Sequence, residues 1–260
     1  MKKINIFLIL LILVLPCFSL AQEEKEALIQ SKSIKLGIGL EYLSRTIRWG
    51  DDNNNSRFNS LFFMLNTQFE VKEGLYASAS FGYSFSNYEG LQFKKELPFS
   101  LELGDRSIEG YLLGLEIKKS IVYREELEID VLGQFFCYLG SSETWRIPAD
   151  YLNVAGTAQG SPSWTRISIG PVFTYKGFES LTPYLYLSFN KLWGTFTMDE
   201  TIQELEGHEE LKIYGKSLFS TSLGGIYKIT EVISIKTEAT FMPYRGGVDL
   251  GLSVKALFSF

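Results

Sequence analysis

The chain has 260 residues, of which 45% are hydrophobic and 15% aromatic, and its formal net charge is −5. This acidic balance makes nucleic acid an unexpected partner, because the phosphate backbone selects basic surfaces. After residue 21, no apolar run approaches the ~20 residues that a membrane-spanning helix needs.

The N-terminal segment has the three parts of a secretory signal peptide. A basic start, Lys2-Lys3, precedes an apolar run at 4–15 and a small-x-small triplet that ends at Ala21. The alternative, a membrane-spanning helix, is disfavoured because the run is too short to cross a bilayer. We therefore predict a signal peptide at 1–21, a short tail at 22–32 and one folded domain at 33–260.

Ten segments of the folded domain alternate apolar and polar residues, which is the period-two pattern of a strand with one apolar face. In the last segment, every second residue from Val248 to Phe260 is apolar, and Asp249 and Lys255 fall between them. The apolar face carries no charge, so it must meet either a protein core or lipid. We predict strands at 33–47, 60–72, 75–86, 107–123, 126–139, 164–176, 181–196, 211–228, 232–243 and 247–260.

The connections between these segments alternate in length. Short turns at 72–74, 124–125, 176–179 and 230–231 alternate with long links at 48–59, 87–106, 140–163 and 197–210, and a last short link lies at 243–246. An even strand number with the long loops on one side is typical of a transmembrane antiparallel up-and-down β-barrel. We predict an all-β barrel of ten strands, with eight strands as the alternative.

A closed barrel would also stabilise a chain that has no disulfide bond. Only Cys137 remains after the predicted cleavage, so the chain has no internal disulfide, and a sheet closed on itself is another source of stability. Closure is required in a bilayer, because no water is present there to satisfy an open sheet edge. The strand that ends at Phe260 must then pair with the strand that begins near Ser33.

Aromatic residues gather at the strand ends, as in the two interfacial girdles of membrane barrels. The girdle on the long-loop side is predicted to contain Trp49, Phe85, Trp164 and Trp193. The girdle on the short-turn side is predicted to contain Phe69, Tyr123, Tyr175, Tyr227 and Phe260.

The polar faces of the strands carry charges of both signs, which are expected to pair inside the lumen. A barrel of about eight strands has an interior that side chains fill, so a ten-stranded barrel is expected to be largely filled as well. Tyr184, Tyr186 and Phe136 are expected to complete the filling. The predicted lumenal charge network comprises Lys35, Glu41, Arg45, Glu70, Glu116, Lys118, Glu128, Asp130, Arg166, Lys236, Glu238, Asp249 and Lys255.

The leader, the alternating strands and the closing segment 254–260 together resemble the small outer-membrane β-barrel proteins of Gram-negative bacteria. The resemblance covers the chain from residue 22 onward, and it implies that Phe258 and Phe260 form the signal that the barrel-assembly machinery recognises. It further implies a location in the outer membrane, a periplasmic tail, and contact with lipid and lipopolysaccharide. It carries no activity, since barrels of this class serve as adhesins, enzymes, channels and structural proteins.

The strand number is also similar to that of the omptin proteases, which use a pair of aspartates facing an Asp-x-His pair at the rim. The one histidine, His208, lies in the fourth long link, two residues after Glu206. The second long link offers no Asp-x-Asp, only Glu89, Glu96, Glu102 and Asp105. We therefore predict a protein that is not an enzyme, with an omptin-like hydrolase as an alternative, and we predict no metal and no cofactor.

The third long link contains the other candidate residues, Trp145 and Tyr151. Loops held by a rigid scaffold often carry function, so these two residues are candidates for binding an extracellular ligand that the sequence does not identify. The predicted function is structural or surface-binding. A narrow channel for small solutes is a further alternative, and it requires a lumen less filled than expected.

Overall fold

A computed structural model describes residues 34–49, 55–89, 92–93, 101–102, 107–147 and 156–260. The predicted signal peptide at 1–21 and the tail at 22–32 lie outside these residues. No helix in the described ranges is long and apolar enough to span a membrane.

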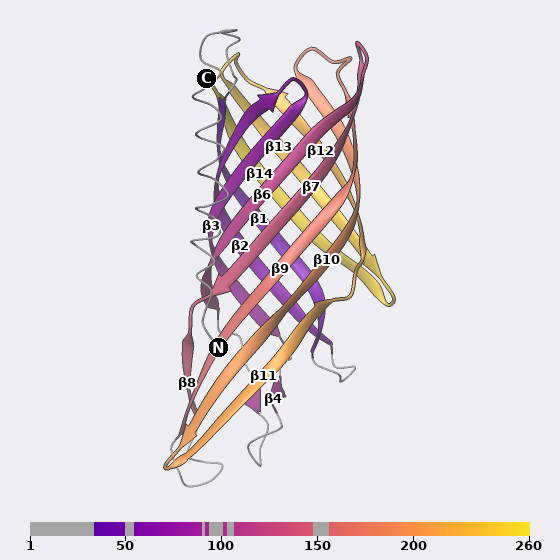
Figure 1. Cartoon of the computed structure of the whole chain (residues 1–260). Coiled ribbons are helices and arrows are strands. Elements are labelled where there is room, and N and C mark those ends of the chain that lie inside the picture. The colour runs from indigo at the N-terminus through magenta and orange to yellow at the C-terminus, as the bar shows by residue number, and fades with distance from the viewer. Residues whose placement is uncertain (1–33, 50–54, 90–91, 94–100, 103–106, 148–155) are drawn as a thin grey trace. The chain divides into compact units, whose positions relative to one another are not determined.

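Ten antiparallel strands form a closed ring (Figure 1). Closure is made by the first and last strands, which pair from Lys35↔Ser259 to Ser44↔Leu250, while the amide and carbonyl groups of Ile34 and Phe260 bond to each other. The ten-strand prediction is confirmed, and the eight-strand alternative is wrong. In ring order the strands are β1(Ile34–Trp49), β2(Asn55–Lys72), β3(Leu75–Glu89), β6(Ile108–Tyr123), β7(Leu127–Gly140), β9(Gly156–Tyr175), β10(Leu181–Ile202), β12(Phe219–Lys228), β13(Ile233–Tyr244) and β14(Gly247–Ser259).

Four short turns, β2–β3, β6–β7, β9–β10 and β12–β13, lie together at one end of the barrel, here called the short-turn end. The long connections lie at the other end, the long-loop end, together with the short β13–β14 turn. At the β2–β3 turn, Gly74 adopts a φ of 65°, a conformation that glycine adopts readily. Four further strands lie in the long connections. β4(Gln92–Phe93) pairs with β5(Leu101–Glu102), β8(Glu143–Ile147) pairs with the ring strand β9, and β11(Leu205–Gly215) pairs with the ring strand β10.

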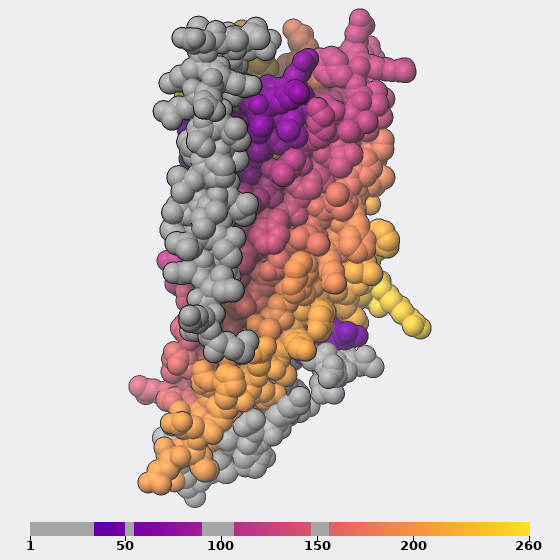
Figure 2. All heavy atoms as spheres, viewed as in Figure 1, coloured from indigo at the N-terminus to yellow at the C-terminus, as the bar shows by residue number. Residues whose placement is uncertain are grey.

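The predicted strand 211–228 is two strands, because the short β13–β14 hairpin ends before its neighbours do. β12 pairs with β13 up to Thr221↔Phe241, whereas β11 pairs directly with β1 from Ile47↔Gly215 to Trp49↔Ile213. The inward-facing residues are odd-numbered in β11 and even-numbered in β12, so the alternation changes phase at 216–218. β10 and β11 extend as a hairpin past the end of β14, and their atoms form the orange part of the face in Figure 2.

The two faces of the wall differ as the alternation predicts. Outward apolar side chains are exposed, among them Ile38 (60%), Ile117 (59%) and Val248 (58%). The short-turn aromatics Phe69, Tyr123, Tyr175, Tyr227 and Phe260 are all exposed. The prediction for Trp49 and Trp164 is wrong: both are buried, at 4% and 3% exposure, because they share the inward phase of Glu41 and Arg166.

Candidate functional site

Toward the long-loop end, inward-facing side chains form a buried apolar cluster that we call the lumenal core. Seven of its residues are aromatic rings in contact with one another: Trp49, Phe58, Phe62, Tyr88, Tyr138, Trp164 and Phe196. The aliphatic side chains of Leu43, Ile47, Met64, Ile108, Leu112, Leu192 and Ile213 pack with them.

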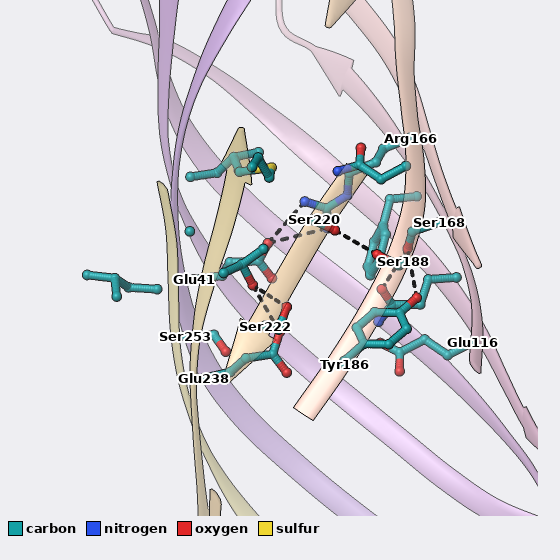
Figure 3. Close-up of a pocket in the computed structure, with 18 of the residues that line it drawn as sticks. Glu41, Glu116, Arg166, Ser168, Tyr186, Ser188, Ser220, Ser222, Glu238 and Ser253 are labelled. Atoms are coloured by element: carbon teal, nitrogen blue, oxygen red, sulfur yellow. Dashed lines mark hydrogen bonds and ion pairs between the residues drawn. The ribbon is translucent and has the colours of Figure 1, made fainter. Parts of the chain in front are cut away.

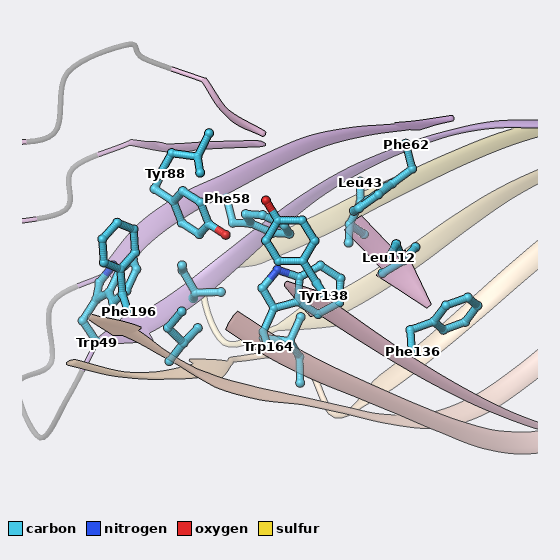
Figure 4. Packing of buried hydrophobic residues seen from close by; sticks show 14 of the residues in the cluster. Leu43, Trp49, Phe58, Phe62, Tyr88, Leu112, Phe136, Tyr138, Trp164 and Phe196 are labelled. Atoms are coloured by element: carbon cyan, nitrogen blue, oxygen red, sulfur yellow. The ribbon is translucent and has the colours of Figure 1, made fainter. Parts of the chain in front are cut away.

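The rings connect opposite walls of the barrel. Phe58 of β2 meets Trp164 of β9 with ring centroids 5.6 Å apart, although three strands separate β2 from β9 in the ring. Tyr88 of β3 meets Phe196 of β10 at 5.6 Å in the same way. Figure 4 shows these rings filling the space between the strands, with Trp49 and Phe196 nearest the long loops and Phe136 farthest from them. The lumenal core therefore occupies the lumen from wall to wall.

Inward-facing glycines make room for these rings. A Cβ atom added to Gly110 would lie 2.5 Å from the Tyr138 hydroxyl, and one added to Gly114 would lie 2.5 Å from the Phe136 ring. Both glycines lie on β6, which contacts β7 along its length. The absence of side chains at these positions leaves room for the Tyr138 and Phe136 rings of β7.

An ion pair spans the lumen next to the lumenal core, on its short-turn side. Arg166 Nη2 of β9 lies 3.3 Å from Glu41 Oε1 of β1, and four ring strands separate β1 from β9 on either side. The Arg166 guanidinium also stacks on the Phe136 ring at 4.5 Å. Arg166 therefore joins the lumenal core to the polar part of the lumen (Figure 3).

Beyond this pair, toward the short-turn end, lies a polar cavity of about 870 Å³. We call it the short-turn cavity, because its lining reaches Glu73 and Gly74 of the β2–β3 turn. Half of the charged residues that line it form ion pairs: Lys118 with Asp130 at 3.1 Å, Lys176 with Glu128 at 2.6 Å, and Lys236 with Glu238 at 3.7 Å.

All thirteen residues of the predicted charge network lie on inward-facing positions. Eleven of them line the short-turn cavity or the small pocket of about 70 Å³ next to it: Lys35, Glu41, Glu70, Glu116, Lys118, Glu128, Asp130, Arg166, Lys236, Glu238 and Lys255. Arg45 and Asp249 are instead fully buried, next to the break between β11 and β12 at 216–218. There the Arg45 side chain donates to the Ser217 carbonyl at 2.9 Å, and Asp249 accepts from Thr46 at 2.8 Å.

The expected filling of the lumen differs from what the structure contains. Near the long-loop end it is filled by aromatic side chains, whereas at the short-turn end the charged residues surround a cavity. Phe136 belongs to the lumenal core. Tyr184 and Tyr186 lie at the cavity wall, where Tyr184 donates to Glu238 at 2.6 Å and Tyr186 bonds to Ser168 at 3.4 Å. Ten strands enclose more volume than paired lysine and carboxylate side chains occupy, which explains the cavity.

At the long-loop end, His208 pairs with Asp199 across the β10–β11 hairpin, with Nδ1 2.6 Å from Oδ1. The expected partner, Glu206, lies opposite Thr201 instead. Both side chains of the pair are well exposed, at 63% and 61%. Among the described residues, no three His, Cys, Asp or Glu side chains gather as a metal site. The structure does not describe the side chains of Glu96, Glu102 and Asp105, the acids considered as the pair that would face His208.

The remaining candidate residues are the predicted ligand-binding residues of the third long link and the predicted assembly signal at the C-terminus. Trp145 of β8 packs against the lumenal core, so much of its ring is not available to an external ligand. Tyr151 lies outside the described residues. Phe260 is 73% exposed beside Ile34 at the short-turn end, and Phe258 pairs with Leu36.

Of the seven contacting rings, only Trp49 and Trp164 are placed in the sequence analysis, in the interfacial girdle, and the other five are assigned to no part of the barrel. Counting in steps of two from a lumenal charge identifies rings of the lumenal core: Glu41 leads to Trp49, Glu70 leads to Phe62 and Phe58, and Arg166 leads to Trp164. Asp199 carried no comparable signal, because its partnership with His208 depends on the register of the hairpin.

Neither a protein-family model nor a curated protein matches the chain. Solved structures do match. The chain is similar to the translocator domain of autotransporter NalP from Neisseria meningitidis, with 11% identity, a TM-score of 0.51, and coverage of 95% of this chain and 98% of that one. It is also similar to outer membrane protease OmpT from Escherichia coli, with 10% identity, a TM-score of 0.57, and coverage of 91% and 100%. By fold, the chain is a ten-stranded transmembrane antiparallel β-barrel of the kind found in outer-membrane proteins.

Proposed function

We propose that this protein is an outer-membrane barrel that conducts no solute and acts as a structural or surface-binding scaffold. In this proposal the signal peptide at 1–21 directs export, and the barrel-assembly machinery recognises Phe258 and Phe260. The short-turn end faces the periplasm, and the long-loop end faces outward among lipopolysaccharide.

The observation that carries the proposal is the lumenal core. A solute passing from end to end would have to displace rings that are almost completely buried, such as Phe196 (0% exposed) and Phe58 (1%). The same passage would have to open the ion pair between Arg166 and Glu41. Well-packed interiors resist such displacement, because each lost contact removes dispersion energy.

The long-loop end supports the binding part of the proposal. There β8, β9, β10 and β11 pair side by side, from Glu143↔Gly160 through Asp199↔Gln159 to Asp199↔His208. This four-stranded extension is held by backbone hydrogen bonds and presents the exposed side chains of Asp199 and His208. Surfaces of this kind, fixed on a scaffold, are suited to contact a partner.

Electrical recording tests the closed lumen. The purified protein is inserted into planar bilayers, with a porin of known conductance as a positive control for the method. We expect no steady openings over a wide range of voltages. Steady openings of uniform size would contradict the proposal and favour the narrow-channel alternative.

A rim hydrolase is a second candidate, and the pairing of His208 with Asp199 is the observation that favours it. A carboxylate that accepts from Nδ1 orients the ring so that Nε2 can act as a base. The fold shared with a protease supports the idea only at the level of architecture. Peptide cleavage that the wild type performs and that both His208→Ala and Asp199→Asn lose would establish this candidate. Absence of cleavage in the wild type across a diverse peptide library would dismiss it.

A further inference from the structure

The inner end of the short-turn cavity is defined by five side chains that also line the small pocket next to it. These residues are Glu116, Tyr186, Lys236, Glu238 and Lys255. Figure 3 shows Glu116, Tyr186 and Glu238 projecting into this part of the lumen below Arg166. This is the deepest point that a solute reaches from the short-turn end, since the ion pair of Arg166 with Glu41 and the lumenal core lie beyond it.

Two of these five residues are charged groups that form no ion pair in the described part of the chain. Lys236 pairs with Glu238, and Tyr184 donates a further hydrogen bond to the same carboxylate. Neither Lys255 nor Glu116 forms an ion pair or a side-chain hydrogen bond within that part of the structure. The other carboxylates deep in the cavity, Glu128 and Asp130, are already neutralised by Lys118 and Lys176.

The register explains why Lys255 forms no ion pair. Lys255 of β14 lies directly opposite Lys236 of β13, and like charges in that position repel each other. Glu238 forms its ion pair with Lys236 and acts on Lys255 only by electrostatic attraction at longer range. On its other side, Lys255 lies opposite Gly39 of β1, and a Cβ atom on Gly39 would lie only 2.6 Å from Lys255 Cγ. A glycine at this position allows the lysine side chain to lie across the wall toward the lumen.

Glu116 projects from a wall well away from Lys255. Three strands separate β6 from β14 in one direction around the ring, and five separate them in the other. The two charges therefore face the same space from different sides without meeting. A group with one charge satisfies only one of them, whereas a group with a cation at one end and an anion at the other satisfies both.

We propose that the short-turn cavity binds a small zwitterionic solute of the amino acid or short peptide class. The carboxylate of the solute contacts Lys255, and its ammonium group contacts Glu116. The cavity volume of about 870 Å³ lies within the range of small-molecule sites, which is about 300–1,000 Å³. The Tyr186 hydroxyl and the nearby serine hydroxyls supply hydrogen-bonding groups for the peptide units between the two charges. This inference goes beyond the scaffold function and does not depend on it.

The test uses glycine, glycylglycine and triglycine as probes, titrated into the full-length purified barrel and followed by calorimetry. Each peptide is also supplied with its amine acetylated and with its carboxylate amidated. We expect the free peptide of matching length to bind at least about tenfold more tightly than either blocked form, because each blocked form loses one charge-assisted contact. Lys255→Gln should weaken the free peptide by a similar factor and no longer distinguish it from the amidated form. Glu116→Gln should do the same with respect to the acetylated form.

Lys35→Gln is the matched control. Lys35 lines the same cavity and also forms no ion pair within the described residues, but it lies four positions along β1 from Gly39, about 13 Å away at ~3.3 Å per residue. We expect this variant to change affinity less than threefold. The unfolding midpoint of each variant is measured in parallel, and the blocked peptides test the wild type without any substitution.

Four outcomes would overturn the inference. Acetylated peptide that binds as tightly as the free peptide would indicate a simple anion site, and amidated peptide that does so would indicate a cation site. Equal weakening by Lys35→Gln and Lys255→Gln would indicate diffuse attraction by lumenal lysines. No heat of binding from any probe at millimolar concentration would show that the cavity does not bind these zwitterions.

Discussion

Replacing Trp164 with alanine tests whether the lumenal core holds the barrel together. The Trp164 ring is 3% exposed and contacts three other rings: Tyr138, stacked at 5.1 Å, Phe58 at 5.6 Å and Phe62 at 6.2 Å. Removing a large buried aromatic side chain costs about 3–5 kcal/mol. Aromatic pairs add about 0.5–1.5 kcal/mol each beyond the buried area, so three lost pairs place the expected cost at the upper end of that range.

The chain supplies a matched control on the neighbouring strand. Trp193 is adjacent in sequence to Gly194, the residue that pairs with Trp164, and it points outward from the wall. Trp193→Ala also removes a tryptophan side chain, but one that makes no contact with the lumenal core. We expect it to cost much less than Trp164→Ala, because lipid replaces the lost contacts.

The assay is reversible unfolding by guanidinium in lipid vesicles, followed by the fluorescence of the remaining tryptophans. In parallel, the double variant Phe58→Ala/Trp164→Ala is recorded in planar bilayers, where we expect openings that the wild type lacks. If Trp164→Ala costs no more than Trp193→Ala and the double variant stays silent, then the lumenal core neither stabilises nor closes the barrel, and the reasoning is refuted.

Three further substitutions test other parts of the structure. Arg166→Gln leaves the Glu41 carboxylate largely buried and unpaired, so we expect a loss of about 3 kcal/mol that Glu41→Gln partly restores, and a double-mutant cycle without coupling would contradict this. Gly114→Ala should cost about 1–3 kcal/mol by overlap with Phe136, whereas Gly133→Ala, whose added atom has no neighbour closer than 4.0 Å, should be tolerated in the same unfolding assay. Leu115 is an outward-facing residue near the middle of β6, and Leu115→Arg should cost about 2–4 kcal/mol in a bilayer. Tyr123→Arg, at the end of the same strand, should cost about 0–1 kcal/mol, and equal costs for the two variants would argue against lipid contact.

The architecture was predictable because barrel strands are long and their alternation is regular. Every ring strand corresponds to a predicted segment, and the sorting of short turns from long links fixed which ends lie together. The break at 216–218 was not predictable in the same way. A run such as 211–228 is apolar at irregular positions, and only the early end of the β13–β14 hairpin forces β11 across to β1.

The site was predictable in part. The inward positions of charges such as Lys35 and Glu238 follow from phase alone. Which charges pair depends on register and ring position, as with Arg166 and Glu41, which are 125 residues apart in the chain. Nor does the alternation show how much space remains between facing walls, so it cannot distinguish a cavity from a filled lumen. That difference depends on the size of side chains that meet across the barrel, as Phe58 and Trp164 do.

In the barrel described above, outward side chains face lipid and inward ones do not. The measurement that tests it most directly is a spin-label scan of β14 in lipid vesicles, from residue 248 to residue 255, in a Cys137→Ser background that leaves no other thiol in the barrel. We expect labels at Val248, Leu252 and Val254 to collide freely with oxygen, which partitions into the bilayer, and labels at Asp249, Ser253 and Lys255 to be shielded from it. Equal oxygen access at both sets of positions, or the reverse alternation, would contradict the account.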